Sequence, residues 1–266
     1  MTSAQSNPFK RLSWRIGLGT YRLGIETESV VSRALALGWR HIDTAALYRN
    51  EAAVGAAIRA SGIPRHELFV TTKIHVDDIA RFQIAEAVER ALTRLGQIDL
   101  ILLHGWRPQA PEAWAMLTEQ VDRGRVPLIG VSNFAADDLM KLAPPLPAVN
   151  QIEMSPFLQR RALRGAMSAS RIVTVAHSPL AKAKRMNAIA TAMAGFCDWQ
   201  RKNPTPAQAL LSWSIARNAV PLPRSRNETH LRENLSALDI ELEPDLLARL
   251  DLLEDGFSTH PRSIRE

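Results

Sequence analysis

Short apolar runs alternate with helical stretches along most of the chain. Eight runs of three to seven mostly apolar residues have the length and composition of buried β-strands. These runs cover residues 15–19, 41–43, 68–74, 99–104, 128–132, 148–154, 172–178 and 219–223. Between them apolar residues recur at helical spacing, as at positions 30, 31, 34, 35 and 37. Strands that alternate with helices predict βα units and a parallel sheet.

Turn-forming residues mark several helix ends. The helical stretch 77–96 closes on Gly96, because glycine tolerates the left-handed conformation that follows many helices. The stretches 110–124 and 205–218 each carry a proline near the start, where its missing N–H removes no helical hydrogen bond. These signals favour three helices between the predicted strands.

Eight βα units in 266 residues favour one α/β domain, a (β/α)8 TIM barrel. We expect the barrel to span residues 13–266, after a flexible N-terminal segment of residues 1–12. A doubly wound sheet is the alternative fold, and it normally opens on a G-x-G-x-x-G turn. The early glycines at positions 17, 19 and 24 lack that spacing.

Composition narrows the class of protein. Hydrophobic residues make up 46% of the chain and charged residues 23%, which suits a globular protein with a large core. No apolar run approaches the roughly 18 residues that a membrane span needs, and residues 1–15 lack the apolar segment of a secretory signal. Cys197 is the single cysteine, so we expect no intramolecular disulfide and a cytoplasmic protein.

The chain carries a net charge of +6, from 33 basic and 27 acidic residues. This charge suits a phosphorylated small ligand, but solvated arginines explain it equally well. No Lys/Arg run exceeds two residues, and no basic stripe is interleaved with aromatic residues. A nucleic-acid partner is therefore not favoured.

Polar residues stand at the ends of the predicted strands, where α/β barrels carry their active sites. They are Asp43, Lys73, His104, Ser132, Asn133, Asn150, Gln151, His177 and Ser178, with Tyr48 on the loop after the second strand and Arg224, Ser225 and Arg226 after the eighth. Each one alone is explained by a turn, a cap or a solvated side chain. Together they predict one polar cleft, because Lys and Asp rarely lie inside a barrel mouth unless they are paired.

Three segments resemble the signatures of the aldo-keto reductases. They are GWRHIDTAALYRNEAAVG at 38–55, IGVSNF at 129–134 and LPRSRNETHLRENL at 222–235. NQIEMSPF at 150–157 and HSPL at 177–180 also match related segments, so the resemblance runs in order over roughly residues 14–255. It implies NADPH-dependent reduction of aldehydes or ketones to alcohols on a TIM barrel.

The resemblance assigns a catalytic tetrad to Asp43, Tyr48, Lys73 and His104. Tyr48 would be the general acid, since negative charge develops on the carbonyl oxygen during hydride transfer. We expect the Lys73 ammonium to lower the phenol pKa from about 10, with Asp43 holding Lys73 in place. His104 would orient the carbonyl.

The resemblance also implies cofactor and substrate positions. The cofactor-binding residues are Thr20, Tyr21, Asp43, Ser132, Asn133, Gln151, His177, Ser178, Leu180, Arg224, Ser225, Arg226, His230, Glu233 and Asn234. The cluster 224–226 suits the 2′-phosphate of NADPH, because a guanidinium matches phosphate geometry. Tyr48, His104 and Trp106 would contact the substrate, with Trp14 and His75 as further neighbours.

Two positions depart from the family pattern. His177 replaces an aromatic ring that stacks on the nicotinamide, and a protonated imidazole would repel the oxidised ring. His230 replaces an arginine near the adenosine phosphate, so NADH use is also possible. The short segment 104–114 and the short tail predict an open pocket that admits varied carbonyl compounds.

A second hypothesis is a cofactor-sensing binding or regulatory protein on the same barrel, with little turnover, because fold alone does not fix function. A nucleic-acid binder is a third. We expect a monomer with a small-molecule aldehyde or ketone as its partner, and neither a metal site nor membrane association.

Overall fold

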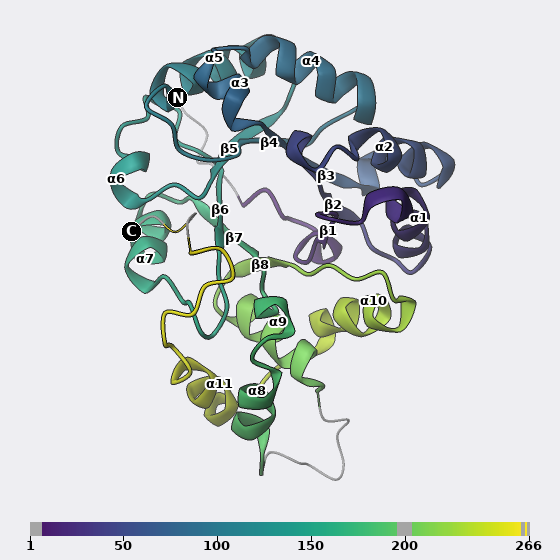
Figure 1. The fold of residues 1–266 in the computed structure, drawn as a ribbon, viewed down its shortest axis with the longest axis vertical. Coiled ribbons are helices and arrows are strands. Elements are labelled where there is room, and N and C mark those ends of the chain that lie inside the picture. Colours follow the sequence, from purple (N-terminus) through teal and green to yellow (C-terminus); the bar gives the residue numbers. More distant parts are fainter. Residues whose placement is uncertain (1–6, 196–203, 262–263, 265–266) are drawn as a thin grey trace.

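The computed structural model describes residues 7–195, 204–261 and 264. Eight parallel strands lie side by side in chain order, with helices around them (Figure 1). They are β1 (Leu18–Gly19), β2 (His41–Asp43), β3 (Phe69–Ile74), β4 (Leu100–Leu103), β5 (Leu128–Ser132), β6 (Val149–Glu153), β7 (Val173–His177) and β8 (Ala219–Leu222). Two hydrogen bonds join the first strand to the last and close the barrel. Gly17 N donates to Pro221 O at 3.0 Å, and Gly19 N donates to Pro223 O at 2.9 Å. The predicted (β/α)8 barrel is confirmed.

The helices cover the outside of this barrel. They are α1 (Thr27–Ala36), α2 (Glu51–Ala60), α3 (Val76–Ala80), α4 (Ile84–Leu95), α5 (Ala110–Asp122), α6 (Ala136–Leu139), α7 (Arg161–Ala169), α8 (Met186–Met193), α9 (Pro206–Ala216), α10 (Glu228–Leu235) and α11 (Pro244–Asp251). Short 3-10 helices cover Leu12–Trp14, Gly24–Glu26, Ala46–Tyr48, Arg65–Glu67, Ala181–Ala183 and Ser236–Asp239. The described part of the chain contains no helix long and apolar enough to cross a membrane. Cys197 lies outside the described residues.

The predicted helix ends are largely confirmed. Gly96 follows α4 with a φ of 84°, and Pro206 opens α9 behind a capping box made by Thr205 and Gln208. The stretch 77–96 differs, because it forms two helices, α3 and α4. Phe82 adopts a φ of 55° between them, and this left-handed residue ends the first helix.

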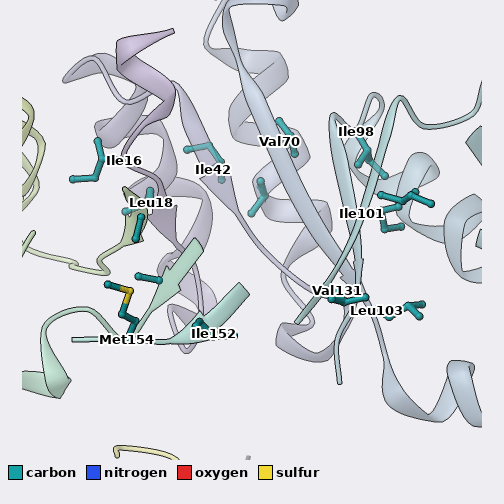
Figure 2. Close-up of a cluster of buried hydrophobic side chains, with 14 of the residues drawn as sticks. Ile16, Leu18, Ile42, Val70, Ile98, Ile101, Leu103, Val131, Ile152 and Met154 are labelled. Carbon is teal, nitrogen blue, oxygen red and sulfur yellow. The ribbon is translucent and has the colours of Figure 1, made fainter. Parts of the chain in front are cut away.

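Two apolar layers hold the barrel together, one on each side of the strands. Ile101 and Leu103 point outward against the helices, together with Ile42, Val70, Val131 and Ile152 (Figure 2). Leu100 and Leu102 belong to a second cluster inside the barrel with Val149, Val175 and Val220. This division follows from the two-residue period of a strand. Each fully buried aliphatic side chain contributes about 1.5–3 kcal/mol.

The N-terminal end of the barrel is closed by aromatic rings. Phe9 is 2% exposed, and its ring centroid lies 4.9 Å from that of Phe69. Trp14 packs 5.3 Å from the same ring and donates a 2.8 Å hydrogen bond from Nε1 to Glu67 O. Because Glu67 precedes β3, Trp14 lies at the end of the barrel opposite Asp43. The prediction that Trp14 borders the substrate pocket is therefore wrong.

Gly17 lies directly before β1, next to side chains of β8 and β2. A Cβ atom at this position would stand 2.5 Å from Leu222 Cδ2 and 2.7 Å from His41 Nδ1, so a larger residue would displace these side chains. The close approach lets the strand pair on both sides and closes the barrel on which the polar strand ends are arranged.

Candidate active site

Several polar residues at the strand ends point into the barrel mouth because they share a strand face with an interior residue two positions earlier. In β6, Val149 lies in the interior cluster, and Gln151 and Glu153 follow it on the same face. In β7, Val175 lies in the interior cluster and His177 follows it. Side chains from separate strands thus meet at one end of the barrel.

A buried ion pair between Asp43 and Lys73 forms the floor of this site. Lys73 Nζ donates a 2.5 Å hydrogen bond to Asp43 Oδ1 and a 2.8 Å bond to Thr44 O. Gln151 Nε2 donates to the other carboxylate oxygen, Asp43 Oδ2, at 2.8 Å. Burial raises the pKa of Asp43 and lowers the pKa of Lys73, while their mutual attraction opposes both shifts. The pairing satisfies two charges that would be costly to bury separately.

Tyr48 stands above this pair on the 3-10 helix Ala46–Tyr48. Lys73 Nζ lies 5.2 Å from the centroid of its ring. Burial raises the pKa of Tyr48 well above its usual value, and the negative charge of Asp43 raises it further. The expected lowering by Lys73 is wrong for this structure, because burial of the phenol and the charge of Asp43 raise its pKa instead. The phenol is therefore fully protonated at neutral pH.

His104 faces the same phenol from the end of β4. Its ring centroid lies 5.8 Å from that of Tyr48 in an edge-to-face arrangement. Burial, and then the positive charge of Lys73, lowers the pKa of His104 well below its usual value, so the imidazole is neutral. Its Nδ1 is buried and has no hydrogen-bond partner among the described residues. A proton on Nε2 avoids an unsatisfied buried donor and leaves an N–H group for a ligand.

Asn50 fixes the loop that carries Tyr48. It accepts a 2.8 Å hydrogen bond from Thr44 Oγ1 and donates a 2.9 Å bond from Nδ2 to Thr20 O. The loops after β1 and β2 are therefore tied together below the phenol. The sequence showed Asn50 only as an amide ahead of a helix, which is typical of a cap, although its side chain caps nothing in α2.

A cavity of about 850 Å³ opens over these groups. Sixteen of the predicted site residues line it: Thr20, Tyr21, Asp43, Tyr48, His104, Ser132, Asn133, Gln151, His177, Ser178, Leu180, Arg224, Ser225, His230, Glu233 and Asn234. Lys73 is also a predicted site residue, but it does not line the cavity and lies beneath Asp43. This volume and mixed lining are typical of a small-molecule or cofactor site.

His177 is held as a neutral ring on one wall of this cavity. Its Nε2 lies 2.9 Å from Asn133 Oδ1, and Asn133 Nδ2 donates a 3.0 Å hydrogen bond to Ser132 Oγ. Burial lowers the pKa of His177 to about 3, against the opposing charge of Glu153. The ring is uncharged at neutral pH, so the repulsion of an oxidised nicotinamide considered above does not arise.

Arg226 and Trp106 lie outside the cavity lining. Arg226 Nη2 donates a 2.7 Å hydrogen bond to Arg22 O, and Arg226 Nη1 lies 3.6 Å from Glu26 Oε1. Trp106 packs edge-to-face against Phe134, with ring centroids 5.4 Å apart. Arg226 therefore ties two loops together, whereas Arg224 lines the cavity.

Comparisons with known proteins fit this geometry. A sequence profile of the Aldo/keto reductase family matches residues 15–255. The chain belongs to this family. It is 42% identical to an aldo-keto reductase of Mycolicibacterium vanbaalenii over 92% of this chain and 90% of that one. It is 36% identical to the methylglyoxal reductase DkgA of Yersinia pestis, over 94% of this chain and 92% of that one.

A solved structure supports the same assignment. MGS-M4, an aldo-keto reductase from a Medee basin deep-sea metagenome library, superimposes with a TM-score of 0.86. The two chains are 32% identical, and the match covers 92% of each. Family membership makes this protein an oxidoreductase of the group that reduces small carbonyl compounds with nicotinamide cofactors.

Sequence reasoning about this reductase missed several residues around the cavity. Leu47, Val76, Lys182 and His260 line it, and so does His75, which had been expected only as a neighbour. No strand periodicity distinguishes these positions, because they lie in short 3-10 helices, at the start of α3 and just before it, and on the C-terminal tail. Among the described residues, no group of three or more His, Cys, Asp or Glu side chains could hold a metal ion.

Proposed function

We propose that this aldo-keto reductase reduces aldehyde or ketone carbonyls to alcohols by hydride transfer, with Tyr48 as the general acid. One observation carries the proposal. A protonated phenol and a neutral imidazole, Tyr48 and His104, face one cavity directly above the buried pair of Lys73 and Asp43. A proton donor beside a fixed cation is the arrangement that stabilises a developing alkoxide.

The chain's own residues would orient the carbonyl and deliver the proton. The nicotinamide cofactor supplies the hydride when it is bound. His104 would donate from Nε2 to the carbonyl oxygen and hold it beside Tyr48. As negative charge develops on this oxygen, the Tyr48 O–H proton moves to it and completes the alcohol. Lys73 lies close enough to stabilise the phenolate that remains.

The cavity fits a nicotinamide cofactor. Ser132, Asn133 and Gln151 offer amide and hydroxyl groups at the strand ends, which suit a carboxamide. Arg224 lines the cavity and makes no hydrogen bond or ion pair with any residue that the structure describes. Its guanidinium is therefore available to a phosphate. We propose NADPH as the preferred cofactor, with NADH also accepted, because Arg226 is committed to Glu26 and His230 is no fixed cation.

The substrate would be a small carbonyl compound. The lining near Tyr48 contains apolar Leu47 and Val76 together with polar His75, so it suits small molecules that are only partly polar. Because the Yersinia pestis relative is named a methylglyoxal reductase, a 2-oxoaldehyde belongs in any substrate panel. We propose Trp106 as an outer wall of the substrate site, beyond the cavity lining.

The deciding experiment compares the two tyrosines of the chain. The oxidation of NADPH is followed by its absorbance with a panel of aldehydes and a 2-oxoaldehyde. We expect Tyr48→Phe to lower kcat by about 10²–10⁴-fold, the usual contribution of a general acid. Tyr21→Phe is the matched control, since its ring packs 5.0 Å from that of Tyr48 but has no part in proton transfer.

The alternative is a cofactor-sensing protein with little turnover on the same barrel. It predicts tight NADPH binding and the same negligible turnover for the unaltered protein and for Tyr48→Phe. That result would overturn the proposed function, whereas turnover that falls only in Tyr48→Phe would exclude the alternative.

A further inference from the structure

Glu51 is a buried carboxylate that the proposed chemistry does not use. It is the first residue of α2 and lies three positions after Tyr48, the last residue of the preceding 3-10 helix. The residue is 2% exposed, and it does not line the cavity. A carboxylate in such a place is costly unless polar groups bind it.

Two neighbouring elements supply those polar groups. Thr72 Oγ1, in β3, donates a 2.6 Å hydrogen bond to Glu51 Oε1, and Thr72 is itself fully buried. Arg94 Nη1, in α4, donates a 3.0 Å hydrogen bond to Glu51 Oε2. Both carboxylate oxygens are therefore bound, and the start of α2 is fixed to β3 and to α4.

The bond to Thr72 connects the two segments that carry the phenol and the ammonium. Thr72 immediately precedes Lys73 in β3. Because successive side chains of a strand point to opposite faces, Thr72 faces α2 while Lys73 points into the barrel. Lys73 Nζ lies 5.2 Å from the centroid of the Tyr48 ring. The hydrogen bond thus links the helix start behind Tyr48 to the strand that holds Lys73.

The backbone between Tyr48 and Glu51 also depends on being held at this end. Arg49 adopts a left-handed φ of 56° there. A residue other than glycine keeps this conformation only where the surrounding structure fixes it. Asn50 ties the turn to the loops after β1 and β2, and Glu51 ties it to β3.

The charge of Glu51 favours the ammonium form of Lys73. Burial lowers the pKa of Lys73, the charge and hydrogen bond of Asp43 raise it, and the charge of Glu51 raises it further. The other titratable groups that face Lys73 among the described residues are Asp43, His41, Tyr48, His104 and His177. The three imidazoles are neutral and the phenol is protonated at neutral pH, so Glu51 is a second anion acting on Lys73 beside Asp43.

We propose that Glu51 is a positioning residue for the reduction, which fixes the start of α2 to β3 and so holds Tyr48 over Lys73. Its charge also helps to keep Lys73 protonated, and this ammonium stabilises the phenolate that remains after proton transfer. The inference rests on the proposed function, and it adds a residue that touches neither the cofactor nor the substrate.

Thr72→Val tests the role of the hydrogen bond. Valine has nearly the shape of threonine but no hydroxyl, so this variant removes the bond and keeps the carboxylate. We expect the rate of NADPH oxidation in single turnovers to fall about ten- to hundredfold, because a small misplacement of a reacting group has an effect of this size. Single turnovers are used so that slow cofactor release does not mask the change. The KM of the aldehyde and the Kd of NADPH stay unchanged, since neither Thr72 nor Glu51 lines the cavity.

Glu51→Gln tests the role of the charge, because glutamine still accepts a hydrogen bond from Thr72. Without the charge of Glu51 the pKa of Lys73 is lower, so the ammonium is lost at a lower pH. We therefore expect the alkaline decline of the single-turnover rate to begin at a lower pH than in the unaltered protein. Thr72→Val should leave the pH of this decline unchanged, since it keeps the carboxylate.

Asp99→Asn is the matched control, because Asp99 is also bound by an arginine and by β3. It accepts a 2.6 Å hydrogen bond from Arg65 Nη2 and a 2.7 Å bond from Val70 N, near the opposite end of the strand. This variant should change neither the single-turnover rate nor its pH dependence. Rates are expressed per NADPH-binding site, so that unfolded protein in a preparation is not counted as inactive enzyme.

Two results would each overturn the inference in a protein whose turnover depends on Tyr48. One is an unaltered rate in Thr72→Val, and the other is an alkaline decline at an unaltered pH in Glu51→Gln. Equal turnover by the unaltered protein and by Tyr48→Phe would instead show that the proposed function fails, and this inference with it.

Discussion

The Lys73 ammonium and the Asp43 carboxylate are 2.5 Å apart at the floor of the barrel mouth, with side-chain exposures of 0% and 4%. The pair holds the Lys73 ammonium beneath Tyr48, and the loss of either member would also destabilise the fold. Removing one member of a buried ion pair leaves the other charge without compensation, which costs far more than the net stabilisation by the pair.

We therefore expect Asp43→Asn to lower the free energy of unfolding by about 3–5 kcal/mol. The double variant Asp43→Asn with Lys73→Met should lose less than the sum of the two single losses, because it leaves no unpaired charge. Urea unfolding followed by circular dichroism measures these values. Glu119→Gln is the control, since its pair with Arg123 is 60% exposed on both sides and such pairs contribute less than about 1 kcal/mol. Additive losses in the double variant would contradict the pairing.

Stability at acid pH should depend on His41. Burial lowers the pKa of His41 to about 3, while its hydrogen bond to Trp14 O opposes the shift. The unfolded chain binds a proton near pH 6.5, whereas the folded chain does not, so stability is complete above about pH 6.5 and falls as the pH decreases toward 3. The expected slope from this residue is about 1.4 kcal/mol per pH unit.

His41→Gln should reduce the slope of the unfolding free energy against pH at acid pH by about 1.4 kcal/mol per pH unit. Glutamine keeps polar groups near Trp14 O and Thr71 Oγ1 but does not titrate. The measurement is the unfolding free energy at several pH values between about 4 and 7. His66→Gln, at an exposed position, is the control. If the unfolding free energy decreased equally steeply with falling pH in His41→Gln and in the unaltered protein, folding would not lower the pKa of His41.

The two arginines after β8 should differ in their effect on cofactor choice. Arg224 lines the cavity, whereas Arg226 is bound to Arg22 O and Glu26. Arg224→Ala should raise the Kd of NADPH by about tenfold or more, the usual worth of a charge-assisted phosphate contact, and leave the Kd of NADH unchanged. Fluorescence quenching measures both constants, and Arg226→Ala is the matched control. A larger effect at Arg226 would reverse the assignment.

His177 should support the cofactor by its hydrogen bond to Asn133 as well as by its ring. His177→Gln can keep a donor toward Asn133 Oδ1 but loses the ring, whereas His177→Phe keeps a ring and loses the donor. Each variant should therefore raise the Kd of NADPH by about three- to tenfold, since one neutral hydrogen bond contributes about 1 kcal/mol. Unchanged affinity in His177→Phe would leave stacking as the sole role of this residue.

The sequence predicted those parts of the molecule that depend on local pattern. Strand periodicity placed Asp43, Lys73 and His104 at one end of a barrel, and the structure brings them together around Tyr48. The division of 77–96 into α3 and α4 depends on the left-handed Phe82, which no propensity reveals.

Contacts between residues far apart in the sequence could not be predicted from local pattern. The tail at Ser258 reaches Glu153 across 105 positions, and Arg226 meets Arg22 across 204. Neither contact produces a periodic pattern in the sequence from which it could be predicted. The direction of the Tyr48 pKa shift was also missed, because it depends on how deeply the phenol is buried and on the nearby charge of Asp43.

Transfer of a deuterium label tests the central claim most directly. NADPH carrying deuterium at the transferable position of its nicotinamide is incubated with an aldehyde and the unaltered protein, and the alcohol is analysed by mass spectrometry. Reduction at this site predicts an alcohol labelled at the former carbonyl carbon, still formed by Tyr21→Phe and lost in Tyr48→Phe. An unlabelled alcohol, or labelled alcohol formed at the same rate by Tyr48→Phe, would contradict the account.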